Sequence, residues 1–254
     1  MSVTLEIRDL SVRFGGVRAV SGVSLGVSAG EILSIIGPNG AGKTTIFNVV
    51  TGLHRPTAGE VRLRGQPIAG FPPHVRARLG VARTFQNIRL FRDLTVEENV
   101  RVARYGHARV GLLAALLRTQ GFRRDRGETD GKVAALLDGV GLGGRGGELA
   151  RSLPYGDQKR VELARALATE PSVLLLDEPA AGMSTAEADD LMALIRSLRH
   201  RGLAILLVEH HIRVVMGVSD RVAVLNHGEL IAEGPPATVR RDPAVIAAYL
   251  GEGQ

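Results

Sequence analysis

One glycine-rich segment limits the possible folds of this chain more than any other part of the sequence. The segment Gly37–Thr45 fits the phosphate-binding loop pattern G-x-x-x-x-G-K-[ST]. The segment Glu31–Ile36 before it predicts a short buried strand, and the segment Thr45–Val50 after it predicts a helix that ends near Gly52. A strand, a glycine loop and a helix in this order form the structural context in which such a pattern binds phosphate.

The loop offers several kinds of phosphate ligand. Its glycines let the backbone curl until successive N–H groups face one anion, and the following helix adds its positive dipole end. Lys43 adds a point charge for the outer phosphates, and the hydroxyl of Thr44 can bind Mg²⁺. A glycine-rich turn that contains a lysine by chance is the alternative, but it is improbable because lysine occurs only at positions 43, 132 and 159. We therefore expect a nucleotide to bind at Asn39, Gly40, Ala41, Gly42, Lys43, Thr44 and Thr45.

The composition is that of an ordinary globular protein. The chain has 254 residues, of which 44% are apolar, and this length suits one domain with a subdomain. The longest apolar run, near Val110–Leu117, is too short to cross a bilayer, and the first residues do not have the pattern of an export signal. The lack of cysteine excludes disulfides and thiolate chemistry. We expect a cytosolic protein.

The net charge of +6 comes almost wholly from arginine. Such an excess suits nucleic acid or anionic lipid as a partner, and it suits equally arginines spread over solvated faces, which we favour. Basic residues are densest after an expected capping box of Thr95 and Glu98. A basic amphipathic helix there would lie on a membrane or dock on a partner, and a solvated helix packed on its own domain is the alternative. The arginines of this segment are Arg101, Arg104, Arg109, Arg118, Arg123, Arg124 and Arg126, and Val110, Leu113 and Leu117 share one helical face.

Two predicted strands end in groups that can act on a phosphate. The buried strand Val173–Leu176 runs into Asp177 and Glu178, at the carboxyl end where parallel sheets bind ligands. Asp177 can hold Mg²⁺ directly or through water, and Glu178 can activate a water beside the terminal phosphate. An acid pair at a helix start is the alternative. At the end of the strand Ala204–Val208, His210 can hydrogen-bond a γ-phosphate oxygen, and zinc binding is not expected because the next histidine points the other way.

Three further residues carry weaker signals. Phe14 lies at a turn upstream of the glycine loop and is either a core side chain or a ring stacked on adenine. Gln86 ends the predicted strand Val81–Phe85, where a glutamine by itself signals little. Gly156 precedes a strong helix and would let a second anion approach the backbone closely.

Taken together, the motifs resemble the nucleotide-binding subunits of ABC transporters over the whole chain. Gly37–Thr45 matches Walker A and Leu174–Glu178 matches Walker B, while Leu153–Asp157 aligns with the signature Leu-Ser-Gly-Gly-Gln. Three single residues occupy the remaining family positions in order: Phe14 the A-loop aromatic, Gln86 the Q-loop glutamine and His210 the switch histidine. The resemblance implies an α/β P-loop core with an N-terminal antiparallel β subdomain, about residues 1–90 and 160–254, and an inserted helical subdomain, about residues 90–160.

The resemblance also implies the chemistry and the partners. It implies ATP and Mg²⁺ as cofactors, with catalytic roles for Lys43, Glu178 and His210 and metal contacts by Thr44, Gln86 and Asp177. It implies a second ATPase subunit, identical or paralogous, with ATP at the interface, and two integral-membrane permeases on which the helical insert docks. A periplasmic solute-binding protein would act indirectly, and nucleic acid is not an expected partner. The chain would lie at the cytoplasmic face of the membrane.

Several segments narrow the resemblance to importers of branched-chain amino acids. They are Thr84–Asn87, Leu153–Gln158, Glu209–His210, Ser219–Val222 and the ending Ala248–Gly251. An ABC ATPase for another solute, such as urea or lipid, and an ABC ATPase acting on DNA or ribosomes are the alternatives. The chain departs from the family pattern at Pro154, Tyr155 and Asp157 of the signature and at Ser184, where an aspartate is usual.

Overall fold

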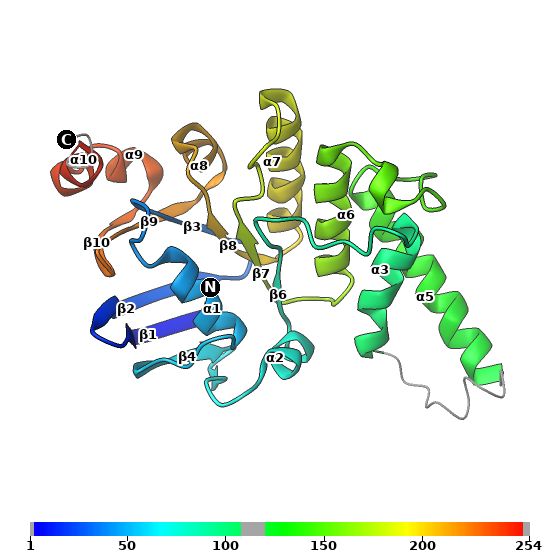
Figure 1. The fold of residues 1–254 in the computed structure, drawn as a ribbon, viewed down its shortest axis with the longest axis horizontal. Coiled ribbons are helices and arrows are strands. Elements are labelled where there is room, and N and C mark those ends of the chain that lie inside the picture. Colours follow the sequence, from blue (N-terminus) through cyan, green and yellow to red (C-terminus); the bar gives the residue numbers. More distant parts are fainter. Residues whose placement is uncertain (1–2, 108–119, 251–254) are drawn as a thin grey trace. The chain divides into compact units, whose positions relative to one another are not determined.

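The structure is a computed structural model that describes residues 3–107 and 120–250. The chain divides into two compact units (Figure 1). The first unit comprises residues 1–83 and 172–254, and the second comprises Thr84–Pro171. Within the described ranges, no helix combines the length and the apolar character needed to cross a membrane.

The first unit is built around a six-stranded sheet with the order β10-β9-β3-β8-β7-β6. Neighbouring strands from β9 to β6 are parallel, and β10 pairs antiparallel with β9 through the turn at His227 and Gly228. Strands β3, β7 and β8 are buried along their whole length, as expected of a parallel sheet covered on both faces. The strands are β3 (Ile32–Ile36), β6 (Val81–Arg83), β7 (Val173–Asp177), β8 (Ala204–Val208), β9 (Arg221–Asn226) and β10 (Glu229–Gly234).

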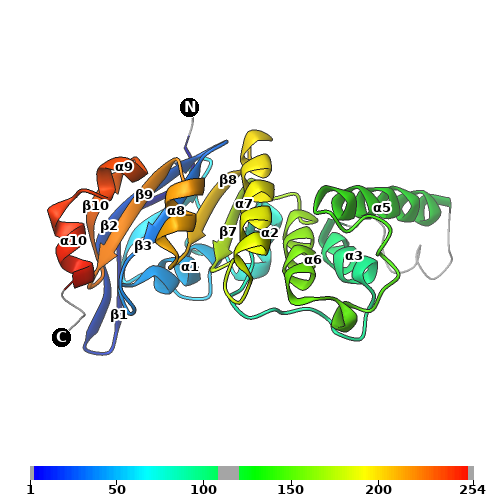
Figure 2. The same cartoon turned by 90° about the horizontal axis from the view of Figure 1, so that it is seen from above.

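Alternation along β9 shows how both faces of this sheet are covered. Ala223 and Leu225 belong to the large apolar cluster that includes Phe47 of helix α1, whereas Val222 and Val224 pack in a cluster with Val215 of helix α8. A strand that buries both of its faces needs apolar residues at every position, which explains the unbroken apolar run. Figure 2 shows the helices of this unit beside the sheet: α1 (Lys43–Thr51), α2 (Pro73–Leu79), α7 (Thr185–His200), α8 (Ile212–Val218), α9 (Pro236–Val239) and α10 (Pro243–Leu250).

A second, antiparallel sheet of the first unit has the order β2-β1-β4-β5. Its inward-facing residues, among them Ile7, Val23 and Val61, join the same apolar cluster as helix α1. The sheet therefore packs on the face of the core that carries the glycine loop. Its strands are β1 (Val3–Phe14), β2 (Val17–Ser28), β4 (Ala58–Leu63) and β5 (Gln66–Pro67).

Arg76 fixes the carboxyl end of α1 from within this unit. Its side chain is among the largest fully buried ones, and it donates hydrogen bonds to the carbonyls of Val49, Val50, Phe71 and Ala69 at 2.5–2.9 Å. A cation suits the carbonyl end of a helix, where the last C=O groups have no intrahelical donor. Burial lowers the pKa of Arg76. The local sequence did not predict the contact with α1, because the carbonyls of Val49 and Val50 lie 27 and 26 positions before Arg76.

The second unit consists of helices, in agreement with the expected helical insert. They are α3 (Val96–Arg104), the 3₁₀ turns Tyr105–His107 and Ala150–Ser152, α5 (Gln120–Gly139) and α6 (Tyr155–Leu167). The capping box is confirmed, since Thr95 Oγ1 accepts from the N–H of Glu98 and the Glu98 carboxylate accepts from the N–H of Thr95. Helix α3 itself ends at Arg104.

The strand predicted at 81–85 is shorter in the structure: β6 ends at Arg83, whose side chain turns to the buried carboxylate of Asp177.

The basic face predicted after Arg104 falls mostly outside the described residues: Arg109, Val110, Leu113, Leu117 and Arg118 lie in the gap at 108–119, and the side chains of Arg123 and Arg124 in α5 are not described. The functional meaning of that face stays a prediction.

Candidate nucleotide site

The glycine loop joins β3 to α1 in the predicted order. Two of its glycines are required by the backbone: Gly37 has φ +147° and Gly42 has φ +103°. A Cβ at Gly37 would lie 2.0 Å from the carbonyl oxygen of Leu225, and one at Gly42 would lie 2.6 Å from that of Ala19. The loop can therefore take this course only with glycine at both positions. It brings the first N–H groups of α1 to the carboxyl edge of the sheet.

Lys43 is the first residue of α1 and is buried. Its ammonium group donates to the carbonyls of Gly37 and Pro38, each at 2.7 Å. The cation is thus held inside the concave side of its own loop, where an anion would face both the charge and the helix dipole. Thr44 and Thr45 follow in the first turn of α1, Ala41 is buried, and Asn39 and Gly40 form the exposed tip.

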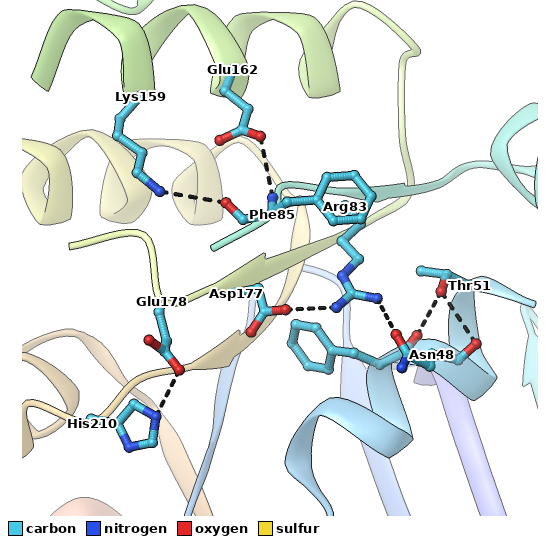
Figure 3. Close-up of polar contacts among 10 residues, drawn as sticks. Asn48, Thr51, Arg83, Phe85, Lys159, Glu162, Asp177, Glu178 and His210 are labelled. Carbon is cyan, nitrogen blue, oxygen red and sulfur yellow. Dashed lines mark hydrogen bonds and ion pairs between the residues drawn. The ribbon is translucent and has the colours of Figure 1, made fainter. Parts of the chain in front are cut away.

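Asp177 is the last residue of β7, and it is engaged by a residue that the sequence did not single out. Arg83, the last residue of β6, places Nη2 2.6 Å from Asp177 Oδ2 (Figure 3). The second terminal nitrogen of Arg83, Nη1, donates to Asn48 Oδ1 of α1 at 2.7 Å. The two side chains are only 7% and 8% exposed, so this is a buried ion pair in direct contact with the helix of the glycine loop.

Glu178 follows Asp177 but leaves the strand direction. Its φ of +47° lies in the left-handed region, which is unusual for a residue other than glycine, and its N–H donates to the carbonyl of Val208 at 2.9 Å. The change of direction turns its carboxylate to the neighbouring strand end, where Oε1 lies 2.7 Å from Nε2 of His210. The structure therefore brings together two of the predicted site residues, one after β7 and one after β8.

The carboxylate of Glu209 contacts both of the histidines that follow it. This carboxylate is 1% exposed; it accepts from the N–H of His210 at 3.1 Å and lies 3.4 Å from Nδ1 of His211. Burial raises the pKa of Glu209, and these hydrogen bonds oppose the rise. The sequence placed His210 at the sheet edge but gave no sign that the acid before it is buried.

Phe14 ends β1 next to the turn at Gly15 and Gly16. Its ring is 47% exposed and meets the ring of His54 edge-on, with centroids 5.3 Å apart. The exposure disagrees with the core-side-chain alternative. A half-exposed ring is available to stack on a base, and this role stays a prediction.

Gln86 and Gly156 both belong to the second unit. Gly156 lies in helix α6, and another residue of α6 contacts Gln86. Gly156 is buried in the first turn of α6, and the ammonium group of Lys159, one turn further on, donates to the carbonyl of Gln86 at 2.7 Å. Glu162 Oε1 accepts from the N–H of Phe85 at 3.3 Å (Figure 3). Two side chains one turn apart on α6 therefore hold the loop before and at Gln86. Burial raises the pKa of Glu162, while Lys159 acts in the opposite direction.

Two of the four departures from the family pattern, Asp157 and Ser184, make structural contacts here. Asp157 forms an ion pair with Arg145 at 2.6 Å. Pro154 occupies the N-cap position of α6, where it makes no side-chain hydrogen bond, and Tyr155 is 42% exposed. Ser184 is the N-cap of α7, with a capping box to Glu187.

The residues present fit Mg²⁺ bound together with a nucleotide. In the described part of the chain, no group of three or more His, Cys, Asp or Glu residues could hold a metal ion. A threonine hydroxyl at the start of α1 and a single buried carboxylate at the end of β7 suit an ion that takes one or two protein ligands and completes its shell with phosphates and water.

Comparisons with known proteins agree with this arrangement. A family model described as "ABC transporter" matches residues 20–181, which is more than half of the chain. The chain belongs to the ABC transporter ATP-binding family. A second model, "Branched-chain amino acid ATP-binding cassette transporter", matches residues 229–254 of this ABC protein.

Relatives of this ABC protein are similar over their full length. It is 48% identical over 249 residues to the high-affinity branched-chain amino acid transport ATP-binding protein LivG of Escherichia coli K12 and to BraF of Pseudomonas aeruginosa; for LivG the match covers 98% of both chains. The crystal structure of another ATP-binding cassette, in its ADP conformation, matches with a TM-score of 0.86 at 30% identity and covers 99% of this chain and all of that one. A dimeric cassette bound to ADP and phosphate matches with a TM-score of 0.76 at 25% identity, covering 91% of this chain and 98% of that chain. The expected fold class is thereby confirmed.

Proposed function

We propose that this chain is the ATP-hydrolysing subunit of a membrane importer for branched-chain amino acids. The observation that carries the proposal is the pairing of Glu178 with His210 at the sheet edge reached by the glycine loop. The solute is inferred from the 48% identity to LivG and BraF, whose names state branched-chain amino acid transport. The ATPase subunit itself has no contact with the solute.

In this proposal the glycine loop binds the phosphates of ATP. Backbone N–H groups of residues 39–45 and the start of α1 face the β- and γ-phosphates, and Lys43 exchanges a loop carbonyl for a phosphate oxygen. Phe14 stacks on the adenine. Mg²⁺, when bound, neutralises charge on the β- and γ-phosphates, and Thr44, Asp177 and Gln86 are the residues that would hold it.

Hydrolysis needs a base and a group that orients it. Glu178 takes a proton from the attacking water, because its left-handed backbone directs the carboxylate away from the strand and because it follows Asp177 at the carboxyl end of β7. His210 fixes that carboxylate and contacts the γ-phosphate. Gly156 and the start of α6 would approach the γ-phosphate bound to a second subunit, identical or paralogous.

The proposed assembly contains two ATPase subunits and two permeases, with a periplasmic binding protein that delivers the solute. The chain would lie in the cytoplasm, attached to the membrane through the permeases. Uptake of radiolabelled leucine, isoleucine and valine tests the proposal in a strain that lacks the gene. We expect uptake to be lost, to return with the parent protein and not to return with Glu178→Gln. Unchanged uptake in the deletion strain would contradict the proposed solute.

A further inference from the structure

Arg83 is buried in the first unit, in contact with the expected magnesium ligand. Its guanidinium is fixed from three sides: Nη2 lies 2.6 Å from Asp177 Oδ2, Nη1 donates to Asn48 Oδ1 at 2.7 Å, and Cζ lies 5.4 Å from the ring centre of Phe47. The acid is on β7, whereas the amide and the ring are on α1, the helix of the glycine loop. A planar group with several donors can satisfy these partners together, which an ammonium group cannot.

An unpaired carboxylate at the position of Asp177 would be electrostatically unfavourable. Burial of an ion without a counter-charge costs far more than burial of a neutral pair, and a divalent cation would relieve that cost. Arg83 already supplies the counter-charge and engages Oδ2. A metal ion that reaches the protein without nucleotide therefore meets a neutral pair instead of a free negative charge.

We infer that Arg83 is the resident counter-cation of Asp177 and that it keeps divalent metal ions from the site until a nucleotide supplies phosphate ligands. The inference rests on the proposed function, since it takes Asp177 as a ligand of Mg²⁺. The phosphates add several negative charges to the site, and these restore the attraction for a divalent ion. Metal and nucleotide thus bind together. Arg83 acts through Asp177 and is a positioning residue.

Binding of Mn²⁺ to the nucleotide-free full-length protein tests the inference. The electron paramagnetic resonance signal of free Mn²⁺ reports how much of the ion is bound. We expect Arg83→Met to bind Mn²⁺ at least about tenfold more tightly than the parent, because the repelling charge is gone and Asp177 is unpaired. Arg83→Lys, which keeps the charge, should remain near the parent. The double variant Arg83→Met with Asp177→Asn should lose the gain.

A purely structural role for Arg83 would not produce a gain of metal binding. If Arg83→Met binds Mn²⁺ no more tightly than the parent, or if Arg83→Lys shows the same gain as Arg83→Met, the inference is wrong. Should Arg83→Met fail to fold, Arg83→Gln removes the charge while keeping an amide donor for Asp177, and the same gain is expected. Titration of the parent with a fluorescent ATP analogue tests the proposed function separately from the inference about Arg83. A parent that binds no nucleotide contradicts the proposed function, whereas the Mn²⁺ comparison addresses only the role of Arg83.

Discussion

Nε2 of His210 lies 2.7 Å from Oε1 of Glu178, a contact between residues that follow two neighbouring strands. Because β7 and β8 are parallel, both residues lie at the same edge of the sheet. The histidine thereby limits the orientations of a carboxylate whose backbone already points away from its strand. Loss of either partner should affect the chemical step more than the fold.

Replacing Glu178 by glutamine should separate binding from hydrolysis. The amide keeps the size of the side chain but cannot take a proton, so ATP affinity should stay within about twofold while phosphate release falls by about 10²–10⁴-fold. Both are measured on the purified protein, by titration with a fluorescent nucleotide and by phosphate release. Lys43→Ala is the contrasting variant and should lose nucleotide binding itself. Hydrolysis by Glu178→Gln near the parent rate would show that another residue is the base.

Removing the ammonium group of Lys159 should loosen the loop that carries Gln86. The buried cation holds the Gln86 carbonyl at 2.7 Å, and a charge-assisted bond of this kind contributes about 1.5–3 kcal/mol. We expect Lys159→Met to speed amide hydrogen exchange in the loop after β6 by about tenfold or more, as measured by mass spectrometry. Lys132→Met, at a partly exposed lysine paired with Glu170, is the matched control and should leave this loop unchanged. Equal protection in both variants would refute the predicted role.

The buried carboxyl of Glu209 should make stability depend on pH. Its pKa is raised above the ordinary 4.5 because burial disfavours the charged form. The folded state therefore binds the proton more tightly than the unfolded state, so the stabilisation is complete below pH 4.5 and is lost as the pH rises through the raised pKa. Glu209→Gln removes that loss, and the melting temperature of the variant relative to the parent should rise between pH 4.5 and 8.

Thermal unfolding across this pH range is the measurement for Glu209. Glu229→Gln, at an exposed position on β10, is the matched control for replacing a carboxylate by an amide. A constant difference between Glu209→Gln and the parent would mean that the carboxyl titrates alike in the folded and unfolded states.

Pro154 should weaken association between two copies of this chain. It occupies the N-cap of α6 without a side-chain hydrogen bond, so it offers no hydroxyl to a phosphate bound by a partner, a loss of about 1.5–3 kcal/mol at each of two sites. In the Glu178→Gln background with Mg-ATP, light scattering should show a weak dimer that Pro154→Ser strengthens. A tight dimer at low micromolar concentration that Pro154→Ser does not improve would contradict this expectation.

The sequence was informative wherever a feature depends on near neighbours. The capping box at Thr95, the helix end at Gly52 and the turn at Gly228 follow from local hydrogen bonds and from backbone angles that favour particular residues. The strand ends at Asp177 and Val208 follow from apolar runs whose length suits a buried parallel strand.

Contacts between distant segments could not be predicted in this way. Arg83 and Asp177 are 94 positions apart, and the carbonyls that bind Arg76 lie up to 27 positions before it. Nothing near either arginine distinguishes it from the many arginines on solvated faces, because the partners appear only after the sheet and α1 have packed. For the same reason, the sequence did not predict that Glu209 is buried.

The left-handed backbone at Glu178 affects what a substitution at this position does to the stability of the fold. An L-residue with a side chain pays about 1–2 kcal/mol in this conformation, and glycine would relieve that strain. Mutation of Glu178 to glycine would relieve this strain and would also remove the carboxylate and its contact with His210. The relief of backbone strain in such an inactive variant would offset part of the stability lost with the His210 contact.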